Sequence, residues 1–167
     1  MRKLIVVASL ALTATLALSA CNKQDDSQQQ AQQQVQKVSK PTDPNDTKAW
    51  GAYLSQIVQQ NMQDMTADRP YPYLVNAGDS DDDKAKRDRQ LDNVKDTVAR
   101  GVLPGNMLVF AGPESSKTAD LILAAFKDAK PGSFKGVIVL FIGDQADQQR
   151  VNDTLQPTGA KVRFVAM

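Results

Sequence analysis

Lys117 and Thr118 stand at the point in this sequence that comes closest to a phosphate-binding loop, since they follow a short apolar run and precede an amphipathic stretch. In the pattern G-x-x-x-x-G-K-[ST], two glycines let backbone N–H groups curl around phosphate oxygens. Ala111 stands at the first glycine position and Ser116 at the second, and the intervening Pro113 has no N–H to donate. We therefore predict that this turn starts a helix and binds no nucleotide.

Four polar side chains around the same turn form a weak candidate pocket. They are Glu114, Ser115, Lys117 and Asp144. A serine beside a lysine can act as a nucleophile with its base, and two carboxylates can share acid–base work if their separation is right. Serines before a helical lysine are also ordinary helix caps, so Ser115 or Ser116 is expected to cap the helix, with Glu114 at its positive end. We assign no catalytic residue and predict that the protein is not an enzyme; an enzyme that uses these loops is kept as an alternative.

The composition of the 167-residue chain removes several common kinds of site. It has no His and a single Cys, which excludes the commonest general base, internal disulfides and a cysteine-rich zinc site. Its formal net charge is +1 and it has no basic cluster, so nucleic-acid binding is not expected.

A calcium site is also not expected. Asp79, Asp81 and Asp83 match the first ligand positions of a calcium-binding loop. Lys84 replaces the glycine that such a loop needs for its sharp turn, and Gln90 replaces its bidentate glutamate. Carboxylates at a helix start explain this cluster better, so we predict no metal and no cofactor.

The first 21 residues have the layout of a bacterial export signal. Arg2 and Lys3 give a short positive region, and residues 4–17 are mostly apolar but too few to span a bilayer comfortably. The motif that follows is Leu18, Ser19, Ala20 and Cys21. It resembles the lipobox of bacterial lipoproteins, in which the signal is cut before the cysteine and the cysteine is acylated. This resemblance implies that residues 1–20 are a signal peptide and that Cys21 carries the lipid.

The same resemblance bears on location. The residue after Cys21 is Asn22, whereas an Asp there usually retains a lipoprotein of enteric-type bacteria at the inner membrane. The resemblance thus implies an outer-membrane lipoprotein whose domain faces the periplasm, with the inner membrane or the cell surface as other locations. ATP and GTP are essentially unavailable in these compartments, which argues further against a nucleotide site. The alternative to a lipoprotein is an ordinary secretory signal or an uncleaved anchor.

Residues 21–46 are predicted to be a disordered, glutamine-rich tether. The stretch is polar and contains Pro41 and Pro44, so it cannot bury enough apolar surface to offset its ordering entropy. A flexible chain of this length reaches about 25–30 Å, which would lift a domain off a membrane. Residues 47–167 are then predicted to form a single α/β domain.

Two helices are expected before the sheet. Apolar residues recur every three or four positions over residues 48–65, and this stripe is interpreted as core. A second helix is expected to follow the aspartates near residue 80 and to stop at Gly101. Between the two helices, Pro70 and Pro72 favour an extended strap without regular pairing.

The C-terminal half predicts alternating strands and helices. The strands are expected at residues 107–111, 137–142 and 162–167, and the helices at residues 115–130 and 144–155. Continuous apolar strands with helix-length connections are typical of a parallel sheet that is buried on both faces. The predicted fold class is α/β, with a small three-stranded parallel sheet (βαβαβ) packed with the two N-terminal helices.

The order of the strands can be predicted from their apolarity. The strand at residues 137–142 is the most apolar, so it is placed at the centre, and both crossover helices then cover one face of the sheet. This order leaves the other face to the N-terminal helices. In the alternative order, the strand at residues 107–111 is central and the crossover helices lie on opposite faces.

These features predict a lipid-anchored envelope lipoprotein whose periplasmic domain is a binding or assembly module. The expected partners are the membrane, through acylated Cys21, and an envelope protein. One alternative is an immunity or inhibitor lipoprotein that blocks a toxin or a wall-degrading enzyme. The other is the enzyme that uses the loops at the carboxyl ends of the strands.

Overall fold

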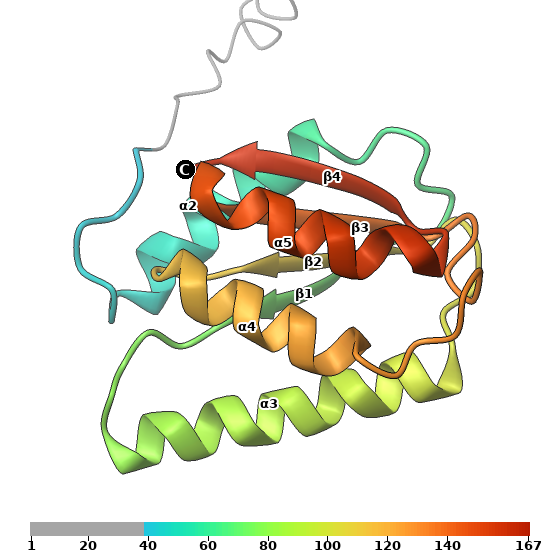
Figure 1. The fold of residues 1–167 in the computed structure, drawn as a ribbon. Helices are drawn as coiled ribbons and strands as arrows, with labels where there is room; N and C mark the ends of the chain where they lie inside the picture. The colour runs from blue at the N-terminus through green and yellow to red at the C-terminus, as the bar shows by residue number, and fades with distance from the viewer. Residues whose placement is uncertain (1–38) are drawn as a thin grey trace, which may run out of the picture. The chain divides into compact units, whose positions relative to one another are not determined.

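A parallel four-stranded sheet organises the computed structural model of this chain, which describes residues 39–167 (Figure 1). The strands lie in the order β1-β2-β3-β4, and each pairs in parallel with the next. The strands are β1 Tyr71–Leu74, β2 Met107–Ala111, β3 Ile138–Gly143 and β4 Lys161–Ala166. The helices are α2 Thr47–Gln60, α3 Asp81–Arg100, α4 Ser115–Phe126, α5 Gln145–Leu155 and the short 3-10 helix η2 Gln156–Thr158. The predicted signal peptide, Cys21 and most of the predicted tether lie outside the described residues.

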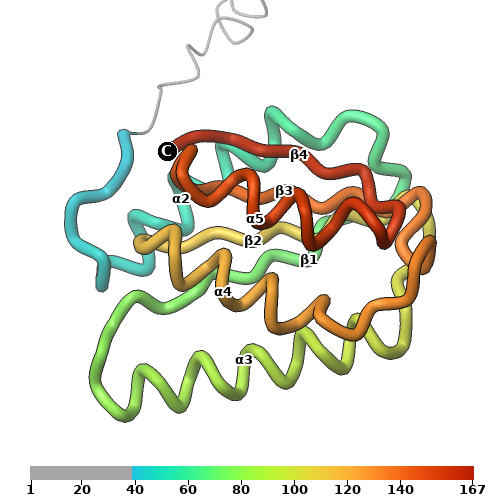
Figure 2. Tube along the Cα trace, in the orientation of Figure 1, coloured from blue at the N-terminus to red at the C-terminus, as the bar shows by residue number. Residues whose placement is uncertain are grey.

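The described helices divide unevenly between the two faces of the sheet. Figure 1 shows α3, α4 and α5 on one face and α2 on the other. Right-handed crossovers that always step to the next strand keep successive helices on one side. The tube in Figure 2 accordingly crosses the sheet in one direction, from β1 to β4. Among the described helices, α2 alone therefore lies on the second face of the four-stranded sheet.

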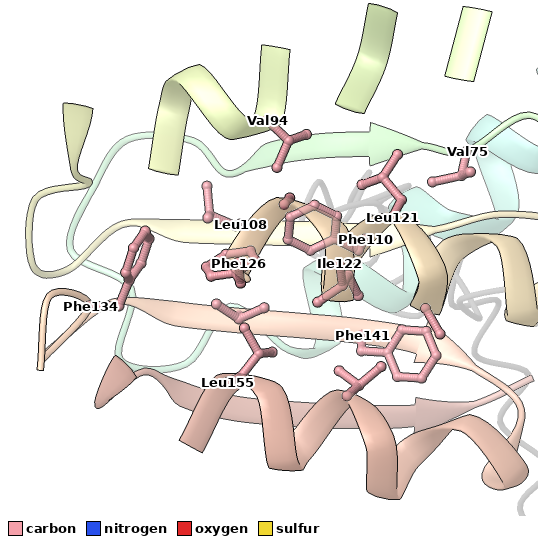
Figure 3. Packing of buried hydrophobic residues seen from close by; sticks show 14 of the residues in the cluster. Val75, Val94, Leu108, Phe110, Leu121, Ile122, Phe126, Phe134, Phe141 and Leu155 are labelled. Carbon is pink, nitrogen blue, oxygen red and sulfur yellow. The ribbon is translucent and has the colours of Figure 1, made fainter. Parts of the chain in front are cut away.

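Alternate residues of the central strands build two hydrophobic clusters. The cluster beneath α3, α4 and α5 includes Phe110 and Phe126 (Figure 3). The cluster beneath α2 joins Trp50 and Leu54 to Leu140 and other residues of β2 and β3. Both clusters belong to one compact unit, Lys37–Met167, so this part of the chain contains the core that it needs to fold by itself.

The segment around Pro72 corrects the prediction of a three-stranded sheet, because it is a fourth strand rather than a strap. Val75 donates its backbone N–H to the carbonyl of Ala111 at 2.7 Å. Alternate residues of a strand point their backbone groups the same way, so Tyr73 and Tyr71 also face β2. The nitrogen of Pro72 then faces the open edge, where a proline removes no hydrogen bond of the ladder.

The predicted position of β3 between the other two C-terminal strands is confirmed, since β3 pairs with both β2 and β4. The alternative order, with helices on opposite faces, is therefore wrong. The prediction that both N-terminal helices cover the remaining face is also wrong, because α3 packs beside α4. Two helices end earlier than predicted, α2 at Gln60 and α4 at Phe126.

Side-chain caps start the two helices that precede β2. The carboxylate of Asp46 accepts a hydrogen bond from the N–H of Ala49 at 2.9 Å, at the start of α2. The hydroxyl of Ser80 does the same for the N–H of Asp83 at 3.1 Å, and Gly101 ends α3 with a φ of 80°. None of the described helices has the length and apolarity that crossing a membrane requires.

Candidate functional site

Ser115, one of the predicted pocket residues, joins the turn after β2 to the turn after β3. It is 3% exposed, and its Oγ donates to Oδ2 of Asp147 at 2.5 Å and accepts from the N–H of Asp144 at 2.7 Å. The N-cap position of α4 belongs to Glu114, whose side chain makes no capping hydrogen bond. The expectation that Ser115 or Ser116 caps α4 is therefore wrong, because Ser115 instead fixes α4 to the start of α5.

Arg150 extends this connection between α4 and α5. Oδ1 of Asp147 lies 2.9 Å from Nε and 2.7 Å from Nη2 of Arg150. The guanidinium also donates to the carbonyl of Ser116 at 3.1 Å and forms an ion pair with Asp120. Its hydrogen bonds to Asp120 and Asp147 raise the pKa of Arg150, so it stays charged. The polar groups of this cluster already have partners, which favours a structural role over a ligand site.

Lys117 has partners other than Ser115. Its Nζ lies 2.7 Å from Oδ1 of Asp79 and 2.8 Å from Oε2 of Glu114, and it donates to the carbonyl of Ala77 at 2.5 Å. The hydrogen bond to Asp79, followed by the one to Glu114, raises the pKa of Lys117. A lysine that activates a serine must be neutral, so this arrangement does not suit a Ser–Lys nucleophile.

The titration of Asp79 should reveal its pairing with Lys117. The hydrogen bond and the charge of Lys117 lower the pKa of Asp79 from its ordinary value of 3.8. The stabilisation from the pair is thus present above the unfolded pKa and is lost as the pH falls through the lower, folded pKa. We expect NMR of the carboxyl groups to show a midpoint below 3.8 for Asp79, and Lys117→Met to raise it. Lys127→Met is the control; a midpoint that Lys117→Met leaves in place would contradict the pairing.

The two predicted pocket carboxylates have different surroundings. Glu114 is engaged by Lys117 and accepts a hydrogen bond from the hydroxyl of Ser116 at 3.2 Å. Asp144 is exposed at the N-cap of α5, and its side chain makes no capping hydrogen bond. No contact described for residues 39–167 joins the two carboxylates, so the structure does not bring them together as an acid–base pair.

Asp79 and Asp83 of the calcium-like pattern bind other side chains of this chain. Asp83 accepts hydrogen bonds from Asn76 at 3.0 Å and from the hydroxyl of Ser80 at 2.6 Å, and Asp79 is bound to Lys117. Across residues 39–167, no group of three or more potential metal ligands comes together.

A cavity of about 430 Å³ lies beyond the carboxyl end of β1, between the starts of α2 and α3. Trp50 and Leu74 contribute apolar walls. Several of its polar side chains already have partners, since Asn76 donates to Asp83 and the amide of Gln90 donates to the carbonyl of Leu74 at 3.1 Å. A ligand in this cavity would have to replace these hydrogen bonds.

A groove of about 470 Å³ between α2 and β1 is the stronger candidate surface. Gly51, Ser55 and Val58 line it from α2, and Pro72 and Leu74 line it from β1. None of its lining residues is charged, although charged residues make up 23% of the chain. Depletion of charge is typical of the centre of protein interfaces. The groove therefore suits an uncharged partner surface.

The outer edge of β1 is closed to a further strand. Pro72 has no N–H to donate there, and the carbonyl of Leu74 accepts a hydrogen bond from Gln90 of α3. Proline and covered backbone groups are common ways in which proteins protect an edge strand. A partner is therefore expected to lie in the groove itself and not to extend the sheet at β1.

The predictions above miss the groove between α2 and β1, although the sequence contains a signal for it. Lys48 is the only charged residue of α2, whereas more than half of the residues of α3 are charged. Gly51, Ser55 and Gln59 are exposed along α2 without any charge among them. This face borders a groove only because β1 extends the sheet beside α2. Predicting the groove therefore requires the strand order as well as the charge pattern.

Comparison with known proteins adds no assignment, because no protein-family model, no curated protein and no solved structure matches this chain. The functional interpretation therefore rests on the geometry described above and on the N-terminal motif.

Proposed function

We propose that this chain is a lipid-anchored envelope lipoprotein of the outer membrane, whose periplasmic domain is a binding or assembly module. The motif that ends in Cys21 supports the anchor. Each buried methylene of an acyl chain adds about 0.8 kcal/mol, so several chains on one cysteine hold firmly without a basic patch. The observation that carries the binding role is the uncharged groove between α2 and β1.

Binding fits the described side chains better than catalysis does. The two residues of the candidate Ser–Lys pair are engaged elsewhere, Ser115 with Asp147 and Lys117 with Asp79 and Glu114. The groove, by contrast, exposes apolar surface with no charged group to solvate it. Surfaces of this kind mark interaction sites in soluble domains.

Metabolic labelling tests the anchor. Radiolabelled palmitate should enter the wild-type chain and should be absent from Cys21→Ser, because the single Cys is the acceptor. A matched control combines Cys21→Ser with Ser27→Cys, which restores a cysteine outside the motif and should remain unlabelled. Label that persists in Cys21→Ser would refute the lipoprotein assignment.

Cross-linking in the same cells tests the binding role. A short-range cross-linker should trap the wild-type chain in an adduct that Ser55→Arg abolishes, because the new charge lies in the uncharged groove. Asn93→Arg, an exposed position on α3, should leave the adduct intact. An adduct that survives Ser55→Arg would show that the groove is not the binding surface.

A further inference from the structure

We propose that the groove is filled by helix α2 of a second copy of this chain, so that two domains pair face to face about a two-fold axis. Each α2 then lies beside the α2 of the partner and covers the β1 edge of the partner's sheet face, which the partner's own α2 leaves open. This inference rests on the binding role proposed for the groove and names the partner.

The part of this sheet face that α2 leaves open is its β1 edge, where Pro72 is exposed and Leu74 is half-buried, whereas Val109 and Ala111 are buried. Four strands spaced about 4.8 Å apart span more than the roughly 10 Å diameter of a helix, so α2 cannot cover them all. The groove floor includes Val109 and Ala111 of β2, and its far wall is Pro72 and Leu74 of β1. Parallel sheets are normally covered on both faces, which makes a second helix the natural occupant.

Gly51 points to a close approach at this surface. A Cβ at Gly51 would have no atom within 4 Å, so the packing of the single chain does not require glycine there. Glycine inside a helix is less stable than alanine, and Gly51 lies within α2 and lines the groove. A glycine and the small Ser55 on the next turn allow another helix to approach closely.

The charge pattern favours a second copy as the partner. A two-fold axis brings the same surface of both copies together, so any charge on it meets a like charge. The α2 face avoids this repulsion, since no residue of the groove is charged and Lys48 lies near one end of the helix. The highly charged α3 lies on the opposite face of the sheet and stays in solvent.

The size of this surface implies a reversible dimer. Two helices side by side, each about 20 Å long and about 10 Å wide, cover roughly 400 Å² on each protomer. The total is at the small end for specific protein interfaces, where association is transient. Anchors in one membrane would raise the local concentration of the two copies.

Analytical ultracentrifugation of the chain from Asn22 onward tests the dimer without the lipid, because this chain keeps the whole compact unit. From about 1 µM to 1 mM, the wild type should shift from monomer to dimer. Ser55→Arg should weaken the dimer by at least about tenfold, since it buries two like charges, while Asn93→Arg should not. A wild type that stays monomeric throughout, or a dimer that Ser55→Arg does not weaken, overturns the proposal.

Gly51→Ala separates association from folding. It should raise the Tm of the monomer by about 2–5 °C, because alanine favours the helix and its Cβ enters open space. The same methyl group should weaken the dimer several-fold by holding the two helices apart. Tighter or unchanged association in Gly51→Ala would contradict the contact at this residue.

Disulfide trapping distinguishes the second copy from another envelope protein. In the chain from Asn22 onward, which lacks Cys21, Ser55→Cys should form a disulfide-linked dimer of twice the mass under mild oxidation, and Asn93→Cys should not. If the cellular adduct instead contains a different protein and the purified chain stays monomeric, the binding role stands and the second copy is rejected. If neither association occurs, the binding role fails as well.

Discussion

Trp50→Ala is expected to lower the free energy of unfolding by about 3–5 kcal/mol, which corresponds to a Tm lower by about 10–20 °C. Trp50 is 1% exposed and packs in the cluster beneath α2 with residues of β2 and β3. Its indole N–H also donates to the carbonyl of Asp43 at 3.0 Å. Alanine would leave a large cavity where α2 meets the sheet and would remove the hydrogen bond to Asp43. Thermal unfolding followed by circular dichroism measures the loss.

Trp50→Phe is the matched control for this prediction. It keeps most of the ring volume and removes the hydrogen bond to Asp43, so it should cost roughly 1–3 kcal/mol, less than alanine. Since Trp50 is the only tryptophan, its native fluorescence in the unmodified chain also reports whether α2 is docked. Equal stability of Trp50→Ala and the wild type would show that α2 does not pack on the sheet as described.

Gly112→Ala is expected to lower the free energy of unfolding by about 2–3 kcal/mol. A Cβ on Gly112 would lie 2.5 Å from the carbonyl oxygen of Val75 and 2.8 Å from Oγ1 of Thr118. The carbonyl cannot easily move away, because the N–H of the same residue is bonded to Ala111 of β2. The added methyl group therefore strains the pairing of β1 with β2.

Gly51→Ala is the control for this prediction, because alanine at position 51 should stabilise the monomer. Chemical denaturation of both variants in the chain from Asn22 onward should yield changes of opposite sign. If Gly112→Ala is as stable as the wild type, β1 does not approach the turn after β2 as closely as described.

The apolar pattern of the sequence was enough to predict the two central strands, β2 and β3, and their place in the sheet. Met107–Ala111 is buried at every position, and its apolar run predicts a strand with the same bounds. The most apolar strand, β3, lies between β2 and β4 because burial on both faces requires neighbours on both sides. Helix ends were less predictable: α4 stops at Phe126, although residues up to 130 remain compatible with a helix.

β1 could not be predicted because its pairing is a property of the assembled sheet. Proline excludes a strand only where its nitrogen faces a neighbour, and the nitrogen of Pro72 faces the edge. The candidate site depends on the same strand, since the chain that leaves β1 carries Asp79 to Lys117, 38 residues away in the sequence. The groove likewise exists because β1 extends the sheet beyond the cover of α2.

The strand order also has a consequence for where chemistry can occur in this fold. In doubly wound sheets, ligands bind at a topological switch point, where the strand order reverses and adjacent loops diverge to opposite faces. The order β1-β2-β3-β4 contains no reversal, so the loops after β2 and β3 turn toward the same side. Their side chains meet and bond to each other, as Ser115 does with Asp147, where other α/β folds open a crevice.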